Sequence, residues 1–255
     1  MNAKPGVEVA CLSDVGRLRE NNEDACLYWE PATDAEFRRK GRLAVVADGM
    51  GGYEGGQEAS RLAVETVREV YGRAGDGDPQ AALLHAFAAA HERIQNYAAQ
   101  HPGYHGMGTT CTALVLLQRQ LYFAHVGDSR LYLLRASRLS RLTRDHSYVS
   151  RLVENGIVRS EDAERHPQRH ILTAALGAGG EVLADQTAQG MQLEPGDTLI
   201  LCTDGLWSVV SEEELATLGS AKDPTESCSA LVKLALQRGG PDNITVQILR
   251  VVPSG

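Results

Sequence analysis

Long apolar runs are missing from this chain of 255 residues. The longest, such as TALVLL at residues 112–117, are far shorter than the roughly 20 residues that a membrane-spanning helix needs. Residues 1–16, MNAKPGVEVACLSDVG, likewise hold no apolar segment of signal-peptide length. We therefore expect no membrane segment and a cytoplasmic location.

Paired cysteines and an excess of positive charge are missing as well. The five cysteines form no CxxC pair, and all but Cys228 lie in strand-like apolar segments, which predicts reduced, buried thiols. The 33 acidic and 25 basic residues give a formal net charge of −8, which repels phosphate backbones. We therefore expect no nucleic-acid partner, whereas an acidic chain suits a cation site.

Internal repeats, low-complexity tracts and linker-like shifts of composition are also absent from the sequence. With 43% hydrophobic residues the chain can bury one full core, so we expect a single domain over residues 1–255 that acts as a monomer. Strand patterns come in groups, separated by helical patterns at residues 56–71, 79–100 and 225–238. Hairpin-connected strands interrupted by helices predict an α+β fold with antiparallel sheets and helices packed outside them.

Aspartates recur at the edges of the apolar runs, beside glycine, asparagine or another acid. They are Asp24 in NNEDACLYW, Asp48 in VVADGMGG, Asp128 in HVGDSRLYLL, Asp204 in LILCTDGLW and Asp242 in GGPDNITVQI. One such aspartate is ordinary turn chemistry. If these strand ends converge, however, the carboxylates would raise one another's pKa values and destabilise the fold unless cations neutralised them. An oxygen-rich set without histidine or cysteine spacing favours Mg²⁺ or Mn²⁺ over zinc.

Glycines follow one of these aspartates closely, in the stretch LAVVADGMGGYEGGQEAS at residues 43–60. Such a cluster fits either a loop whose backbone approaches a ligand or a turn between a strand and a helix. We expect Gly51 and Gly52 to turn the chain away from the strand end. Gly55 and Gly56 are interpreted as the start of the following helix.

Seven short motifs carry a resemblance to a known family. They are RENNED at 19–24, ADGMGG at 47–52, GMGTT at 106–110, VGDSR at 126–130, TRDH at 143–146, TDG at 203–205 and GGPDN at 239–243. In this order they resemble the metal-dependent serine/threonine protein phosphatases of type 2C (PPM), in their bacterial single-domain form. The resemblance implies hydrolysis of phosphoserine and phosphothreonine in proteins, opposing a bacterial kinase. It also implies a central β-sandwich of two antiparallel sheets flanked by helix pairs, with the acids at one end.

The resemblance assigns metal ligands residue by residue. Asp48 would bridge two Mn²⁺ or Mg²⁺ ions, and Asp204 and Asp242 would complete the ligands of one of them. The carbonyl of Gly49 would bind the other ion, and Glu23 would hold a water in its shell. Two ions that share a carboxylate can activate one water as a nucleophile.

Further roles follow from the same resemblance. Asp24 would orient the attacking water, and Arg19 would clamp the phosphate with its planar guanidinium. Asp128 would bind a third, weaker ion, with Asp145 as a neighbour of that site. For both aspartates, hairpin and turn chemistry is the alternative.

Two further features accompany these assignments. Met50 stands where many eukaryotic relatives carry a histidine that could protonate the leaving group. Either a metal-bound water or another histidine would then supply the proton, and His146, His166 and His170 are the candidate histidines. Thr109 and Thr110 are interpreted as strand formers. The polar segment at residues 147–177, which we call the flap, is predicted to be helical. It resembles the family's mobile segment beside the catalytic cleft, and it also fits a surface helix hairpin stabilised by charge pairs.

Two other functions stay open at this level. A phosphoprotein-binding pseudophosphatase would keep the fold without turnover, but a binding module has no need of a costly carboxylate cluster. Another metal-dependent phosphoesterase, such as a phosphodiesterase, would be expected to show histidines among its ligands.

Overall fold

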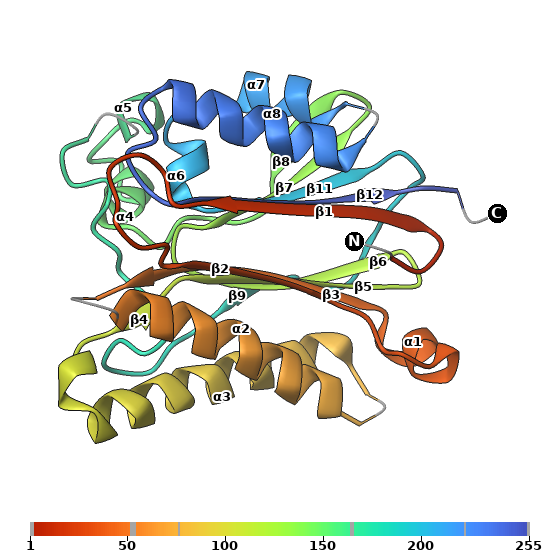
Figure 1. The fold of residues 1–255 in the computed structure, drawn as a ribbon, viewed down its shortest axis with the longest axis horizontal. Coiled ribbons are helices and arrows are strands. Elements are labelled where there is room, and N and C mark those ends of the chain that lie inside the picture. Colours follow the sequence, from red (N-terminus) through yellow and green to blue (C-terminus); the bar gives the residue numbers. More distant parts are fainter. Residues whose placement is uncertain (1–2, 52–54, 76, 164–165, 222, 254–255) are drawn as a thin grey trace.

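Two antiparallel sheets lie face to face in the computed structural model, which describes residues 3–51, 55–75, 77–163, 166–221 and 223–253 (Figure 1). The first sheet consists, in spatial order, of β1 (Val7–Asp14), β12 (Ile244–Val251), β11 (Thr198–Cys202), β7 (Arg130–Arg135) and β8 (Arg138–Arg141). The second consists of β10 (Met191–Gln192), β6 (Gln120–Val126), β5 (Cys111–Leu117), β3 (Arg42–Met50) and β2 (Asp24–Trp29), with β4 (Gly108–Thr109) beside β3 and β9 (Asp185–Gln186) beside β6. The predicted α+β sandwich is confirmed.

Helices cover the outer face of each sheet, as Figure 1 shows. The second sheet is covered by α2 (Gly55–Arg73) and α3 (Pro79–Gln100), and the first by α7 (Glu212–Gly219) and α8 (Pro224–Gln237). The other helices are α1 (Asp34–Lys40), the 3₁₀ turn η1 (Pro102–Tyr104), α4 (Tyr148–Glu154), α5 (Ser160–Ala163) and α6 (Asp204–Trp207). No helix of the described residues is long and apolar enough to cross a membrane.

The strands at the centre of each sheet are buried on both faces, and their successive side chains enter different layers of the core. In β3, Val45 packs into the cluster beneath α2 and α3, whereas its neighbour Val46 packs into the cluster between the two sheets. Successive side chains of a strand point to opposite faces, so one apolar run fills two cores. A third cluster lies under α8 and includes Ile200 and Leu231.

Capping residues set the helix limits that the pattern predicted. Asp78 precedes Pro79 and accepts a hydrogen bond from the backbone N–H of Gln80, so α3 begins where expected. Asp223 caps α8 in the same way, and this helix begins and ends within one residue of the prediction. Gly55 and Gly56 begin α2, as interpreted from the sequence.

Two structural expectations are wrong. The described part of the flap is helical only in α4 and α5, because Gly156 with its positive φ of 68° and the turns after residue 165 interrupt the helix. Cys11 and Cys26 form a disulfide rather than reduced thiols. They lie on β1 and β2, the edge strands of the two facing sheets. Cys111, Cys202 and Cys228 are free and buried as predicted.

Candidate active site

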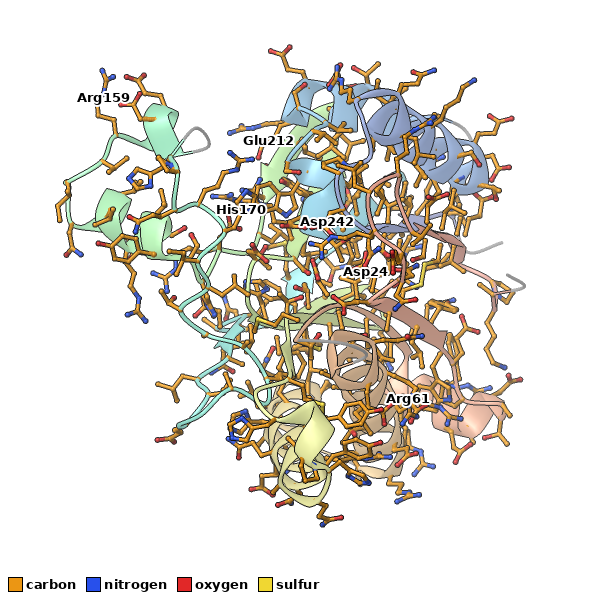
Figure 2. All side chains as sticks on the ribbon, turned by 60° about the vertical axis from the view of Figure 1, so that its left-hand side comes forward. Asp24, Arg61, Arg159, His170, Glu212 and Asp242 are labelled. Carbon is orange, nitrogen blue, oxygen red and sulfur yellow. A yellow bond between two sulfur atoms is a disulfide. The ribbon has the colours of Figure 1, made fainter. Side chains whose placement is uncertain are left out.

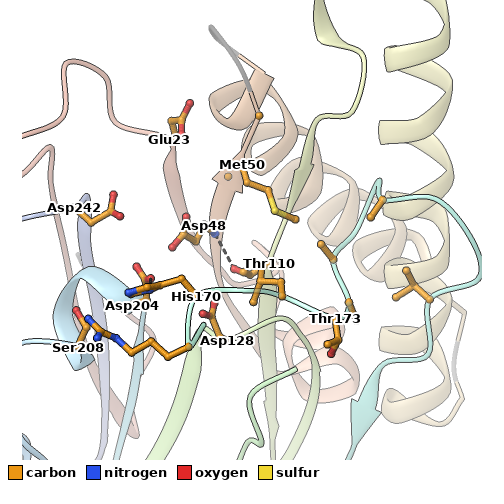
Figure 3. Close-up of a pocket in the computed structure, with 18 of the residues that line it drawn as sticks. Glu23, Asp48, Met50, Thr110, Asp128, His170, Thr173, Asp204, Ser208 and Asp242 are labelled. Carbon is orange, nitrogen blue, oxygen red and sulfur yellow. Dashed lines mark hydrogen bonds and ion pairs between the residues drawn. The ribbon is translucent and has the colours of Figure 1, made fainter. Parts of the chain in front are cut away.

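A cavity of about 820 Å³ lies at the end of the sandwich where β2 begins and β3 ends. Carboxylates from separate elements line it: Glu23, Asp48, Asp128, Asp204 and Asp242 (Figure 3). The strand-edge aspartates therefore converge: four of them line the cavity, and Asp24 lies opposite Asp48 without lining it. Figure 2 shows Arg159 of the flap far out to one side of Asp24 and Asp242.

Backbone pairing fixes Asp48 at the floor of the cavity. Its N–H donates to Thr110 Oγ1 at 2.9 Å, and its carbonyl accepts from the Thr110 N–H at 2.8 Å and from Thr109 Oγ1 at 2.9 Å. The two threonines are thus more than strand formers, since their hydroxyls hold the backbone of the aspartate. Antiparallel register places Asp24 of β2 directly opposite Asp48.

Asp24 lies beside the cavity acids in an enclosed position. Its Oδ2 accepts a hydrogen bond from Thr203 Oγ1 at 2.8 Å, whereas its Oδ1 is buried and has no partner among the described residues. Burial, followed by the nearby charges of Asp204 and Asp242, raises the pKa of Asp24 to about 7. A buried oxygen without a partner and a raised pKa both mark a carboxylate that the fold alone does not satisfy.

Asp48 and Asp128 are also buried carboxylates with raised pKa values. Burial raises the pKa of Asp48 well above its usual range, and the charges of Asp24 and Asp204 raise it further. Burial and the charge of Asp204 do the same for Asp128. A divalent cation would relieve this repulsion, and the donors are all hard oxygens, so they fit Mg²⁺ or Mn²⁺. Among the described residues, no group of three or more histidine, cysteine, aspartate or glutamate side chains is already arranged to hold a metal ion.

Glycine is required where the loops that carry the predicted ligands touch. A Cβ on Gly49 would lie 1.9 Å from the carbonyl oxygen of Gly56 and 2.7 Å from that of Glu23, so only glycine lets β3 end against both. A Cβ on Gly205 would lie 1.9 Å from the carbonyl oxygen of Asn243. Gly51 lines the cavity, whereas Gly52 lies outside the described residues.

Asn243 is a site residue that the sequence analysis missed. Its Oδ1 accepts a hydrogen bond from the Glu23 N–H at 2.8 Å, and its Nδ2 donates to the carbonyls of Val15 and Asn21, each at 2.9 Å. The side chain therefore ties the loop before β2 to the loop that carries Asp242. Its place in GGPDN, directly after the aspartate, is the one sequence signal for this role.

Arg19 reaches the cavity but binds an acid there. Its Nη2 lies 2.8 Å from Asp242 Oδ2, and both side chains are partly exposed. Arg19 thus lines the cavity and pairs with a predicted metal ligand, and its role as a phosphate clamp stays a prediction.

Of the candidate proton sources, only His170 faces the acids. It lines the cavity, with Nδ1 3.8 Å from Asp204 Oδ2. His166 lies in the flap, where its Nδ1 accepts from the Gln168 N–H at 3.2 Å. His146 is outside the cavity lining, with Nε2 3.3 Å from Asp185. Met50 lines the cavity (Figure 3).

Asp145 does not line the cavity either. It binds Arg130 through two hydrogen bonds of 3.0 and 2.7 Å, and both side chains are buried. The guanidinium of Arg130 lies 3.6 Å from the ring centroid of Trp207, whose Nε1 donates to the carbonyl of Asp128 at 2.9 Å. Asp145 thus supports the loop of Asp128 from behind, and Trp207 is a second residue that the sequence analysis missed.

His125 anchors the polar network behind Thr110 and yields a prediction. Its Nε2 donates to the carbonyl of Arg144 at 3.0 Å, and its Nδ1 lies 2.8 Å from Thr112 Oγ1, whose hydroxyl donates to the Ser129 carbonyl at 2.9 Å. Burial and the neighbouring His146 lower the pKa of His125 to about 4.

The unfolded chain, with a histidine pKa of about 6.5, therefore takes up this proton first as the pH falls. We expect the His125 contribution to folding stability to be present above pH ~6.5 and to be lost progressively toward pH ~4. Between pH 7.5 and 5.5, the free energy of unfolding of wild type should fall by about 1 kcal/mol relative to His125→Gln, which keeps a donor for Arg144. Urea unfolding at both pH values measures this gap. An unchanged gap would mean that the imidazole is not held neutral.

Comparison with known proteins agrees with the motif order. The family model described as Protein phosphatase 2C matches residues 18–233. Serine/threonine protein phosphatase PstP of Mycobacterium tuberculosis is 37% identical over 243 residues, which cover 95% of this chain and 45% of PstP. Protein phosphatase PhpP of Streptococcus pneumoniae is 34% identical over 257 residues, which cover 95% of this chain and 97% of PhpP. The chain thus spans about half the length of PstP and nearly all of PhpP.

Solved structures agree as well. The catalytic domain of PstP in complex with two manganese ions aligns with a TM-score of 0.84 and 34% identity, covering 98% of this chain and 100% of that chain. The M. tuberculosis PstP/Ppp phosphatase aligns with a TM-score of 0.87 and 35% identity, covering 97% of this chain and 100% of that chain. With the motifs, the sandwich and the family model in agreement over most of its length, the chain belongs to the protein phosphatase 2C family.

Proposed function

We propose that this chain hydrolyses phosphoserine and phosphothreonine in proteins, using Mn²⁺ or Mg²⁺. The observation that carries the proposal is the convergence of Glu23, Asp48, Asp128, Asp204 and Asp242, which come from separate elements, on one cavity. The names of PstP and PhpP and the two manganese ions of the PstP structure support it. The proposed partners are phosphorylated proteins and a cognate serine/threonine kinase, and the proposed unit is one catalytic domain that acts as a monomer.

The ligand assignment keeps the roles that the resemblance implied. Asp48 would lie between two ions, with Asp204 and Asp242 on one of them. The Gly49 carbonyl, and Glu23 through water, would serve the other. When bound, the ions supply charge neutralisation and a water acidic enough to act as a nucleophile at neutral pH. Asp128 would serve a third ion.

The protein's own groups supply orientation. Asp24 would orient the attacking water, since its buried Oδ1 has no partner among the described residues and it lies opposite Asp48. A cation would compete with Arg19 for Asp242, since Asp242 Oδ2 accepts a hydrogen bond from Arg19 Nη2 at 2.8 Å. We infer that Arg19 then turns from Asp242 to two oxygens of the substrate phosphate, for which its fork is suited.

Arg19→Ala should lower kcat/KM for a phosphopeptide about tenfold or more, chiefly through KM, because a charge-assisted phosphate contact is lost. Arg19→Lys should recover only part of the loss, since an ammonium cannot form the bidentate contact. Steady-state phosphate release measures both variants, and manganese titration should show affinity unchanged or increased once the competing guanidinium is removed. Unchanged kinetics with a phosphopeptide would refute the clamp.

Two substrates distinguish the proposed protein phosphatase from a phosphodiesterase and from a pseudophosphatase. Purified protein with Mn²⁺ should release phosphate from a phosphothreonine peptide and leave bis(p-nitrophenyl) phosphate, a phosphodiester, nearly intact. Preferential cleavage of the diester would favour another phosphoesterase. Binding of the peptide without release would favour a pseudophosphatase.

A further inference from the structure

One wall of the cavity is formed by residues 171–180, which we call the rim and of which residues 171–177 also belong to the flap. The rim residues that line the cavity are Leu172, Thr173, Ala174, Ala175, Ala178 and Gly179. Figure 3 places Thr173 across the cavity from Asp242. The rim therefore lies beyond the acids, where groups attached to a bound phosphate would pass.

Backbone hydrogen bonds hold the first part of the rim. The carbonyl of Ile171 accepts from the Tyr148 N–H at 2.8 Å, and the Thr173 N–H donates to the carbonyl of His146 at 2.8 Å. Leu176 and Thr109 exchange two hydrogen bonds of 2.8 and 3.0 Å. Thr109 is the residue whose hydroxyl also binds the carbonyl of Asp48, so this part of the rim is fixed relative to the floor of the cavity.

Helix α3 holds the last part of the rim through side chains. His91 Nδ1 accepts from the Gly177 N–H at 3.0 Å, and its Nε2 donates to the Gly180 carbonyl at 3.0 Å. Gln95, one turn further along α3, donates from Nε2 to the Ala178 carbonyl at 3.2 Å. One buried imidazole thus spans both ends of the turn at residues 177–180, and the amide binds between them.

Gly177 shows how closely the turn is seated on α3. It has a positive φ of 83°, and a Cβ at this position would lie 2.3 Å from Cγ2 of Ile94. Neither the backbone conformation nor the space admits another residue without a shift. Ile94 lies between His91 and Gln95 in the sequence and is fully buried, so three residues of one helix define the position of the turn.

We infer that His91 and Gln95 are positioning residues that hold the rim as a docking wall for the polypeptide on either side of the phosphorylated residue. This inference rests on the proposed phosphatase function. The rim offers small, partly exposed side chains at Ala174 and Ala178, which leave room for an extended chain. A small phosphoester without flanking peptide needs only the acids and Arg19. The two positioning residues act through the rim and touch no reacting atom.

The test compares two substrates, a phosphothreonine peptide and p-nitrophenyl phosphate. For His91→Ala and Gln95→Ala we expect kcat/KM on the peptide to fall about tenfold, mostly through KM, and turnover of p-nitrophenyl phosphate to stay within about twofold of wild type. Hydrogen exchange of the amides at residues 177–180 should become faster. His91→Gln, which can still accept and donate, should recover part of the peptide activity. His85→Ala, an exposed histidine on the same helix, is the control.

Three outcomes would overturn the inference. Peptide kinetics that match wild type in both variants would do so, as would an equal loss on both substrates, which indicates a merely structural role. Unchanged exchange at residues 177–180 would show that the side chains do not hold the turn. Failure of the proposed function looks different, because wild type itself would then release no phosphate from the peptide.

Discussion

Asp204→Asn and Asp242→Asn are each expected to lower kcat for phosphopeptide hydrolysis by about three orders of magnitude. Asparagine keeps the size of the side chain and one acceptor oxygen but removes the negative charge that would hold a cation. Both residues line the cavity with Asp48, so under the proposed assignment each variant would weaken the binding of the ion that Asp48 would share with them. Phosphate release at saturating peptide, over a range of Mn²⁺ concentrations, measures the effect.

The control for charge alone is Glu226→Gln, an exposed acid on α8 outside the catalytic cavity. It should leave kcat within about twofold of wild type. Manganese affinity, measured by calorimetry, should fall in both aspartate variants and stay unchanged in the control. Full turnover in Asp204→Asn or Asp242→Asn, together with unchanged manganese affinity, would show that the substituted residue is not a metal ligand.

Asp145→Ala should destabilise the fold by about 3–5 kcal/mol, because it leaves the buried guanidinium of Arg130 without its carboxylate. The free energy of unfolding in urea measures the loss. Arg141→Ala is the matched control, since Arg141 approaches the same carboxylate at 3.5 Å from a partly exposed position and should cost less than about 1 kcal/mol.

A double variant separates the buried charge from the rest of the site. Asp145→Leu combined with Arg130→Met removes both charges, and it should be less destabilised than Asp145→Ala alone. If the double variant instead loses the sum of the two single losses, the pair is not coupled and the account of Asp145 is wrong.

The strands and the long helices could be predicted because their signals are local. The continuous apolar run of β3, the aspartate and proline that begin α3, and the aspartate that caps α8 all lie within or directly beside the elements that they define. The short helices α1 and α6 escaped prediction, since one or two turns do not establish a period. The flap was predicted as too helical because its charge pairs, such as Arg159 with Asp162, occur within single turns.

The site was predictable in its acids but not in their pairing. Register between β2 and β3 decides that Asp24 lies opposite Asp48 and outside the cavity lining, and register is a property of the sheet. Whether Asp145 faces a cation or Arg130 depends on contacts across the first sheet, which spacing along the chain does not encode. The disulfide between Cys11 and Cys26 joins different sheets and was missed for the same reason.

Glu23, Asp48, Asp204 and Asp242 are proposed to act through bound divalent cations in the hydrolysis of a phosphoprotein. Phosphate release from a phosphothreonine peptide by wild-type protein, first stripped with a chelator and then titrated with Mn²⁺, tests it most directly. We expect no release above background in the stripped protein and recovery of turnover as Mn²⁺ saturates the site. Turnover that persists in the chelator, or manganese that binds without restoring release, would contradict the account.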